Sequence, residues 1–380
     1  MEKSWDIFHL DGERGLRGGE RQLLYLAAAL RARGHRNTVV CRRGSPLEAE
    51  ARRLGLRTET LPYWLEWDPV SSWKLARLAR RARRPVLHAH TAHTAALACV
   101  ASRLGNLPWV AHRRVDFEPS GALSRRLKYD GAGRVAAVSG AIRDILKRAG
   151  VPGERIAVVP DALPVGAQEC GWAAVPPDAF SPPGAELKSR LRREIARRFG
   201  ASEAGLWVGN LAALVPHKDH DTLLAAALLV LQKKPETTFL IAGEGPEGPR
   251  LFQQIKLMGL AGKVFLLGQV ADPASLLQTL DVFVLSSWGE GMGSVLLEAA
   301  ACGVPIAATT AGGIPEIVAD QKSGLLARPR DPEALAEAVL RLLGDADLRR
   351  RLADKALAGL VSFGLERLAR QMEELYAAIA

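Results

Sequence analysis

The chain has 380 residues, of which 48% are hydrophobic, and its formal net charge is +10. Because single hydrophobic cores usually stop growing at about 250 to 300 residues, this length predicts two domains. The four cysteines include no C-x-x-C pair, which argues against a disulfide framework or a zinc site and fits a reducing compartment.

Neither a secretory signal nor a membrane span is expected from the sequence. The first residues run into charge rather than into an apolar segment. The longest apolar run, residues 223–231, is shorter than the roughly 20 residues that cross a bilayer. We therefore expect a cytoplasmic protein, either soluble or peripheral on the inner face of the cell membrane.

The basic excess lies in the first half of the chain. Residues 1–165 contain 29 Lys and Arg against 16 Asp and Glu, whereas the remainder contains 22 against 25. A basic half beside a near-neutral half suggests an anionic partner, such as nucleic acid, a lipid surface or a phosphorylated acceptor. The alternative is that the arginines lie on solvated helix faces.

In chain order, the first half alternates apolar extended runs with amphipathic runs. Residues 5–10 predict a strand and residues 20–33 a helix, which ends at a capping Gly34. Further strands are predicted at residues 38–41, 86–89, 109–111 and 135–138. This alternation is typical of βαβ units.

The periodicity fails between residues 160 and 183, which are rich in Pro, Ala and Gly, and it restarts at Leu206. Strands are then predicted at residues 206–211, 238–242, 264–267, 282–286 and 305–308. Strands that alternate with helices indicate an α/β protein with two doubly wound parallel sheets, which bind ligands at the carboxyl ends of their strands. The expected parts are an N-terminal Rossmann-like domain (1–165), a linker or insertion (166–187), a C-terminal Rossmann-like domain (188–360) and a final helix that crosses back to the N-terminal domain (361–380).

The most informative stretch is residues 281–318. A buried strand is followed by a glycine-rich loop, and a helix begins near Ser294. Glycines let backbone amides approach a ligand closely, and a helix start favours a phosphate. Glu290 in the loop and Glu298 in the helix can face the same strand end, where carboxylates suit vicinal hydroxyls.

This stretch closely resembles the signature of glycosyltransferase family 4, a large group of retaining GT-B enzymes. The matching segments are the E-x7-E pair Glu290 and Glu298, then C-G-V-P at residues 302–305 and G-G-I-P-E at residues 312–316. The resemblance implies two Rossmann-like domains facing a central cleft. It also implies retaining transfer of a sugar from a nucleoside diphosphate sugar to an acceptor hydroxyl, as in cell-envelope polysaccharide or glycolipid synthesis.

Further matches extend the resemblance over most of the chain. They include the H-x-H strand with His88 and His90, the V-S pair at residues 138–139 and the G-x-G-P turn at residues 243–246. The donor-binding residues that the resemblance implies are Gly18, Gly19, Lys218, Gln269, Val270, Glu290, Gly291, Met292, Gly293, Ser294 and Glu298, and Arg114 is expected with them because it follows the strand predicted at residues 109–111. The implied catalytic residues are His112, Lys218 and Glu290. His112 corresponds to the family's histidine near the reacting sugar, and the alternative is a purely structural histidine.

One position departs from the family pattern. The family often has an arginine six residues before the lysine that Lys218 matches, and Ala212 stands there in this chain. Either a gap shifts the register to Asn210, or a second cation comes from elsewhere. Arg113 and Arg114 are the candidates for it, unless they form a surface pair.

Two other functions compete with this interpretation. Gly243, Gly245 and Gly248 fit the spacing of the dinucleotide fingerprint, so an NAD(P)-dependent oxidoreductase is the rival enzyme, although Pro246 and Pro249 suit that motif poorly. The basic first half raises nucleic-acid binding, but no zinc-finger or RNA-binding aromatic signature supports it, and we expect no nucleic acid as a partner.

Two D-x-D sequences, at residues 219–221 and 345–347, are expected to cap helices rather than to bind metal. We therefore expect no metal and no other cofactor. The expected partners are a nucleotide-sugar donor and a glycan or lipid-linked acceptor.

Residues 61–84 place Trp64, Trp67 and Trp73 ahead of a helical run that carries Arg77, Arg80, Arg81, Arg83 and Arg84. Aromatic and basic residues of this kind favour docking of the N-terminal domain on an anionic membrane. The alternative is an ordinary helix that packs its leucines and tryptophans on the sheet.

Overall fold

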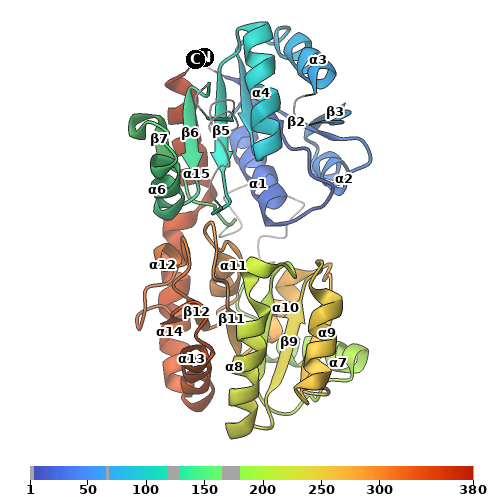
Figure 1. Ribbon diagram of the computed structural model, residues 1–380, viewed down its shortest axis with the longest axis vertical. Coiled ribbons are helices and arrows are strands. Elements are labelled where there is room, and N and C mark those ends of the chain that lie inside the picture. The colour runs from blue at the N-terminus through green and yellow to red at the C-terminus, as the bar shows by residue number, and fades with distance from the viewer. Residues whose placement is uncertain (1–3, 66–67, 118–127, 130, 165–179, 380) are drawn as a thin grey trace. The chain divides into compact units, whose positions relative to one another are not determined.

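The computed structural model describes residues 4–65, 68–117, 128–129, 131–164 and 180–379. The chain divides into two compact units (Figure 1). The first comprises residues 1–177 and 362–380, and the second comprises residues 178–361. Cys170, Trp67 and the predicted linker as far as residue 179 lie outside the described residues.

In the described part of the first unit, seven parallel strands form one sheet in the order β3-β2-β1-β4-β5-β6-β7. Their bounds are β1 (Asp6–Leu10), β2 (Arg36–Arg42), β3 (Arg57–Leu61), β4 (Pro85–Ala89), β5 (Trp109–Arg113), β6 (Arg134–Ala137) and β7 (Ile156–Val158). Every residue of β1 and of β5 is buried, as expected for a parallel sheet that is covered on both faces. The strand order reverses between β1 and β4, so the sheet is doubly wound.

The helices of the first unit cover both faces of this sheet. They are α1 (Gly18–Ala32), α2 (Pro46–Arg53), α3 (Pro69–Ala79), α4 (Ala92–Gly105), α6 (Gly140–Arg148) and α15 (Leu365–Ala377), with the short 3₁₀ turn η2 (Gly153–Arg155). Right-handed crossovers place α1 and α2 on one face and α3 and α4 on the other. The C-terminal helix α15 packs on α1, where Glu373 pairs with Arg33 at 2.7 Å and with His35 at 2.8 Å.

In the described part of the second unit, six parallel strands form a sheet in the order β10-β9-β8-β11-β12-β13. Their bounds are β8 (Trp207–Leu211), β9 (Thr238–Ala242), β10 (Val264–Gly268), β11 (Val282–Leu285), β12 (Ile306–Thr309) and β13 (Leu325–Ala327). The order reverses between β8 and β11, which is the switch point of this sheet. The predicted α/β class with two doubly wound parallel sheets is therefore confirmed.

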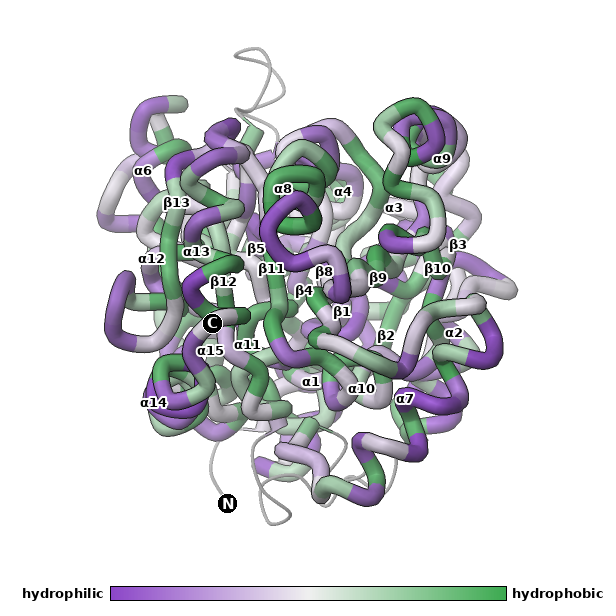
Figure 2. Tube along the Cα trace, turned by 90° about the horizontal axis from the view of Figure 1, so that it is seen from below, coloured by the Kyte–Doolittle hydropathy of each residue, from purple (hydrophilic) through white to green (hydrophobic). Residues whose placement is uncertain are grey.

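The helices of the second unit are α7 (Ala185–Phe199), α8 (His220–Lys233), α9 (Gly248–Leu257), α10 (Pro273–Thr279), α11 (Val295–Ala301), α12 (Ile314–Ile317), α13 (Pro332–Gly344) and α14 (Ala346–Gly359). The 3₁₀ turn η3 (Pro216–Lys218) precedes α8, and η4 (Leu360–Phe363) follows α14. In Figure 2, β11 and β12 are hydrophobic, whereas α14 is largely hydrophilic. The core of this unit therefore lies on the sheet and the inner faces of its helices.

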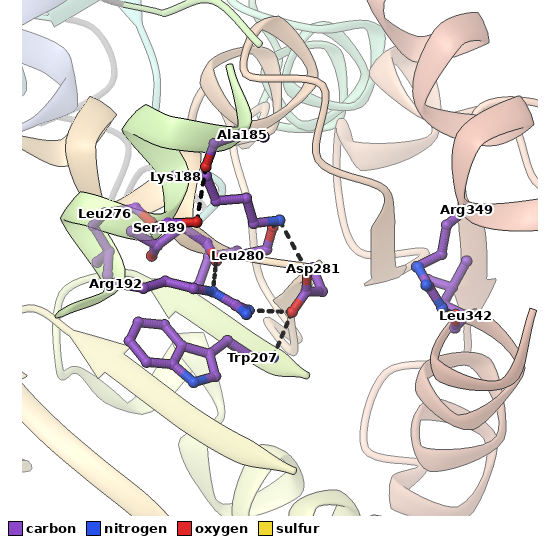
Figure 3. A network of polar contacts seen from close by, with 11 residues as sticks. Ala185, Lys188, Ser189, Arg192, Trp207, Leu276, Leu280, Asp281, Leu342 and Arg349 are labelled. Atoms are coloured by element: carbon purple, nitrogen blue, oxygen red, sulfur yellow. Dashed lines mark hydrogen bonds and ion pairs between the residues drawn. The ribbon is translucent and has the colours of Figure 1, made fainter. Parts of the chain in front are cut away.

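The helix α7 is held to the rest of the second unit mainly by polar contacts. Ala196 is the one residue of this helix that is fully buried, so little apolar packing is available. Figure 3 shows Lys188 and Arg192 converging on Asp281, which immediately precedes β11. The Lys188 Nζ–Asp281 Oδ1 distance is 2.9 Å, and the backbone amide of Trp207 donates to the same carboxylate at 2.8 Å. The Arg192 guanidinium also lies 4.8 Å from the centre of the Trp207 ring.

The helix α3 differs from its predicted form. Proline at its first position and the side chain of Asp68, which accepts from two amides of the first turn, start the helix at Pro69. Trp73 therefore lies within α3 rather than ahead of it. The helix ends at Ala79, so the arginines from Arg81 onward lie beyond it. In the described part of the chain, no helix is both long and apolar enough to cross a bilayer.

Candidate functional site

An ion pair joins the two loops at the switch point of the second unit. Lys218 Nζ lies 2.5 Å from Glu290 Oε2, and the Ser287 hydroxyl donates to the same carboxylate oxygen at 3.1 Å. Both charged side chains are mostly buried, with exposed fractions of 18% and 11%. The carboxyl ends of β8 and β11 thus place two sequence-predicted residues, Lys218 and Glu290, in direct contact.

The backbone around Lys218 explains its position. Lys218 ends the turn η3, and the next residue, Asp219, has a positive φ of 51°. The Asp219 side chain accepts from the Thr222 amide at 3.3 Å, so it caps α8 as the sequence predicts for the first D-x-D segment. The Ser286 hydroxyl donates to the Lys218 carbonyl at 2.9 Å, which ties the two loops together.

A third loop holds the backbone of Glu290. The Gly313 amide donates to the Glu290 carbonyl at 3.3 Å. A Cβ at Gly312 would lie 1.7 Å from that carbonyl oxygen, and Gly312 has a φ of 51°. Any side chain at this position would therefore displace Glu290. The G-G-I-P-E segment thus has a steric reason for its first glycine.

Glu298 lies in the first turn of α11 and is 3% exposed. The predicted residues that lead into this helix are Gly291, Met292, Gly293 and Ser294, and the first three are buried. Gly293 has a φ of 83°, which favours glycine there. Glu290 therefore lies within the tight loop between β11 and α11, and Glu298 lies in the first turn of the helix that follows.

The glycines of the G-x-G-P turn pack against the loop after β8. A Cβ at Gly243 would lie 1.9 Å from the Ala212 carbonyl oxygen, and one at Gly245 would lie 2.2 Å from that of Leu214. Packing thus accounts for these glycines without a dinucleotide. The predicted residues Gln269 and Val270 follow β10, where the Gln269 amide lies 3.4 Å from a Glu244 carboxylate oxygen.

Contacts also explain the two positions at which the family's arginine could align, Ala212 and Asn210. Ala212 donates its amide to the Ala242 carbonyl at 3.0 Å. Asn210, the alternative register, is 2% exposed and donates its side-chain amide to the Val284 carbonyl at 2.9 Å. Asn210 therefore stabilises the sheet, and a register shift does not supply the missing group.

In the first unit, Gly18 and Gly19 form the first turn of α1. Among the described residues, no atom lies within 4 Å of a Cβ built at Gly19. Packing therefore does not require glycine at this position.

His112 lies near the carboxyl end of β5, is 4% exposed, and has no hydrogen-bond partner for either ring nitrogen in the described part of the chain. His88 and His90, on and beside β4, stack on it, and His9 of β1 lies next to those two histidines. Burial and the nearby Arg114 lower the pKa of His112 well below its ordinary value. The imidazole is therefore neutral near pH 7.

The two candidate cations have partners within the first unit. Arg114 Nε pairs with Asp161 Oδ1 at 3.0 Å, and its Nη1 lies 3.1 Å from His90 Nδ1. Arg113 donates to the Tyr129 hydroxyl and to the Phe117 carbonyl. Neither arginine belongs to a surface pair, since Arg113 is buried and the Arg114 side chain is 10% exposed.

Sequence reasoning missed several polar groups of these sites. His9, Asp161 and Ser287 contact predicted residues, and Thr309 donates to the Ser287 carbonyl at 2.5 Å. His9, Ser287 and Thr309 lie at or just after the carboxyl end of a predicted strand, whereas Asp161 follows β7, which the sequence analysis did not predict. A search of the predicted strand ends for polar side chains would have found these three.

Comparisons with known proteins agree with this architecture. The family described as "Glycosyltransferase Family 4" matches residues 16–165, and the family described as "Glycosyl transferases group 1" matches residues 203–345. Together they cover most of both units.

Among curated relatives, a D-inositol 3-phosphate glycosyltransferase of Salinispora arenicola is 34% identical over 206 residues, which are 51% of this chain and 46% of that protein. An N-acetyl-alpha-D-glucosaminyl L-malate synthase of Bacillus anthracis is 34% identical over 187 residues, which are 48% of each chain. The chain therefore matches about half the length of these relatives.

Among solved structures, HepE of Anabaena in complex with UDP and glucose has a TM-score of 0.84 and 22% identity, over 98% of this chain and 99% of that one. Sucrose-phosphate synthase of Thermosynechococcus elongatus has a TM-score of 0.76 and 20% identity, over 99% and 98% of the two chains. At these identities the similarity concerns the fold. With both halves of the sequence matched and the fold shared, the chain belongs to glycosyltransferase family 4, with the GT-B fold.

Proposed function

We propose that this protein is a retaining glycosyltransferase that moves a sugar from a nucleoside diphosphate sugar to an acceptor hydroxyl. The observation that carries the proposal is the Lys218–Glu290 pair at the switch point of a parallel sheet, with the buried Glu298 in the helix that follows the Glu290 loop. Doubly wound sheets bind ligands at this point. The UDP and glucose bound in the HepE structure support a donor of this class.

In this proposal different residues of the second unit bind different parts of the donor. Glu298 accepts hydrogen bonds from the ribose hydroxyls, and Glu290 accepts them from the sugar hydroxyls. Lys218 and the amides of residues 291–294 neutralise the diphosphate. Gln269 and Val270 meet the base through their backbone, and Gly18 and Gly19 of the first unit approach the diphosphate.

We propose a front-face reaction with retention of configuration. The leaving phosphate oxygen takes the proton of the acceptor hydroxyl as the new glycosidic bond forms on the same face of the sugar. Neutral His112 lies near the reacting sugar and donates or accepts a hydrogen bond there. Lys218 and the backbone amides supply the positive charge, so the proposal needs no metal ion and no other cofactor.

Donor binding tests this proposal. We expect one of UDP, GDP or ADP to raise the melting temperature, because a ligand that binds only the folded state stabilises it by about 2.7 kcal/mol at 100 times its dissociation constant. Glu298→Ala should weaken the binding of this nucleotide. Glu290→Ala should lower turnover with the sugar donor more than it weakens nucleotide binding. Thermal shift and steady-state kinetics measure both. Unchanged binding and turnover in both variants would contradict the assignment.

We further propose a lipid-linked acceptor of the cell envelope, reached by docking of the first unit on an anionic membrane. Trp64 and Leu65 are each 71% exposed, and Trp73 and Leu104 are each 53% exposed. A groove of about 430 Å³ between α3 and α4 is lined by Trp73, Ala76, Arg77, Arg80, Arg81 and Leu104. The exposed Trp73 beside three arginines matches a surface of anionic headgroups.

The expected contribution of the arginines differs from the sequence prediction in one respect. Arg84 stacks on the Trp5 ring at 5.2 Å, and the amides of Arg83 and Arg84 donate to Asp6. We expect the docking surface to use the three arginines that line the groove, Arg77, Arg80 and Arg81, each worth about 1 kcal/mol near anionic lipid, while Arg83 is exposed outside the groove lining.

Sedimentation with liposomes measures this docking. We expect the protein to bind vesicles that contain phosphatidylserine or phosphatidylglycerol at low salt and to be released at high salt. Replacing Arg77, Arg80 and Arg81 with serine should abolish binding. The matched control replaces Arg143, Lys147 and Arg148 of α6, which removes the same charge elsewhere in this unit. Equal loss in both triple variants would show nonspecific attraction and refute the proposed surface.

A further inference from the structure

Four buried histidines gather at the carboxyl ends of β1, β4 and β5. His88 stacks on His112 with ring centres 5.5 Å apart, and His90 stacks on His112 at 5.9 Å. His9 Nδ1 lies 3.1 Å from His90 Nε2, and His88 Nδ1 lies 2.8 Å from the Tyr376 hydroxyl. This histidine cluster is 0% to 5% exposed.

The direction of each hydrogen bond follows from the group at one end. A guanidinium has donors and no acceptor, so Arg114 Nη1 donates to His90 Nδ1 over 3.1 Å. A neutral His90 then carries its proton on Nε2 and donates to His9 Nδ1. His9 in turn carries its proton on Nε2 and donates to the Asn37 side-chain oxygen at 2.9 Å.

The Asn37 end agrees with this direction. Its side-chain nitrogen donates to the His35 carbonyl at 3.1 Å, which assigns the remaining oxygen as the acceptor for His9. The chain Arg114–His90–His9–Asn37 is therefore consistent from one end to the other. No bond along it has two donors or two acceptors.

The same chain bears on metal binding. His9, His88 and His90 offer ring nitrogens that all lie within 4.8 Å of one another, which is close enough for a shared ion. A metal needs a lone pair on each ligand nitrogen, but in this series of hydrogen bonds His90 Nε2 carries a proton. The positive charge of Arg114 beside His90 also disfavours a cation there.

We propose that Arg114 is a positioning residue: it sets the proton positions of His90 and His9 and holds the His90 ring against His112. Asp161 orients Arg114, because it pairs with Nε while Nη1 reaches His90. This role differs from the donor-diphosphate contact that the sequence predicted for Arg114. The effect on catalysis rests on the transferase function proposed above, whereas the proton positions do not.

Two measurements test the inference, and the first does not need activity. In protein with ¹⁵N-labelled histidine, long-range proton–nitrogen correlation spectra identify which ring nitrogen is protonated. His9→Gln and His90→Gln assign the signals. We expect both residues to be Nε2–H tautomers in the wild type, and in Arg114→Lys, which keeps a donor. His90 should lose this single tautomer in Arg114→Ala.

The second measurement separates turnover from donor binding. We expect Arg114→Ala to lower kcat by roughly 10- to 100-fold, as misplacement of a group at a reacting centre does. The dissociation constant of the stabilising nucleotide should stay within about twofold, and Arg114→Lys should restore most of kcat. If Arg114→Ala fails to fold, the double variant with Arg114→Met and Asp161→Asn replaces it. This variant removes both charges and leaves no buried carboxylate unpaired.

The following results would contradict the role proposed for Arg114 or the function proposed for the protein. Nucleotide binding weakened tenfold or more in Arg114→Ala, with tautomers unchanged, would make Arg114 a donor contact and overturn the proposal. Unchanged kcat, or an Nδ1–H tautomer of His90 in the wild type, would overturn it too. Uptake of one equivalent of Co²⁺ with the visible absorption of a tetrahedral site, lost in His90→Gln, would establish a metal site instead. If no donor supports transfer, the proposed function fails while the spectra still test the proton positions.

Discussion

Replacing Lys218 with alanine is expected to reduce sugar transfer by about 100-fold or more. A cation that neutralises the leaving diphosphate acts mainly in the transition state, where the loss of one such group costs about 3 to 4 kcal/mol. The structure adds a second reason, since Lys218 also pairs with Glu290 at 2.5 Å. Its removal leaves the Glu290 carboxylate with the Ser287 hydroxyl as its one remaining side-chain contact given by the described residues.

The assay should follow product formation at saturating donor, with excess EDTA present throughout. Activity of the wild type is expected to persist in EDTA, because the positive charge in our proposal comes from Lys218 and backbone amides. The matched control is Lys233→Ala, at the exposed C-terminal end of α8, the helix that follows Lys218. This variant should keep full activity. Combining Lys218→Ala with Glu290→Gln shows whether the unpaired carboxylate causes the loss.

Two results would contradict this assignment. Lys218→Ala protein with a third or more of the wild-type rate would remove Lys218 from the reaction. Complete loss of wild-type activity in EDTA, with recovery on adding Mg²⁺ or Mn²⁺, would show that a metal ion neutralises the diphosphate.

Acidification from pH 6.5 to pH 4 is expected to destabilise the first unit by several kcal/mol. Burial lowers the pKa of His9 from 6.5 to about 4, with a smaller opposing effect of the Asn37 hydrogen bond. Burial and neighbouring charges lower the pKa values of His88, His90 and His112 well below 6.5. Each of these histidines binds a proton more readily in the unfolded chain.

The sign follows from this difference. A group with a depressed pKa in the folded state contributes stability that is present above its unfolded pKa and is lost as the pH falls toward its folded pKa. For His9 alone, the interval between 6.5 and about 4 corresponds to about 3 kcal/mol. Asp11 acts in the opposite sense, because burial raises its pKa to about 7 and its protonated form is favoured in the folded state.

Calorimetry or urea unfolding at pH 7, 5.5 and 4 measures this loss. His9→Gln removes one titrating group, so its stability should vary less over this interval than that of the wild type, whatever its absolute stability. His93→Gln replaces an exposed histidine of α4 and should leave the pH dependence unchanged. Stability that is constant between pH 6.5 and 4 would show that the cluster accommodates charge and would contradict the expectation.

The class of fold followed from the sequence because parallel sheets impose a local pattern. Strands such as β1 and β5 are covered on both faces and must be apolar throughout, while the helices between them keep the 3.6-residue period. The residues of the E-x7-E segment were also found from the sequence, since a loop and the first turn of one helix contain them both. The end of α3 at Ala79 was not predicted, since the arginines that follow it suit a helix as well as a loop.

The partners of the site residues were decided by the tertiary structure alone. Lys218 and Glu290 are 72 residues apart, Arg114 and Asp161 are 47 apart, and His9 and His90 are 81 apart. Local periodicity carries no information on which strands become neighbours, and the strand order decides which loops meet at a sheet edge. Arg114 shows the consequence: its sequence position suggested a free cation, whereas the order of β4, β5 and β7 brings it between a carboxylate and an imidazole that use its donors.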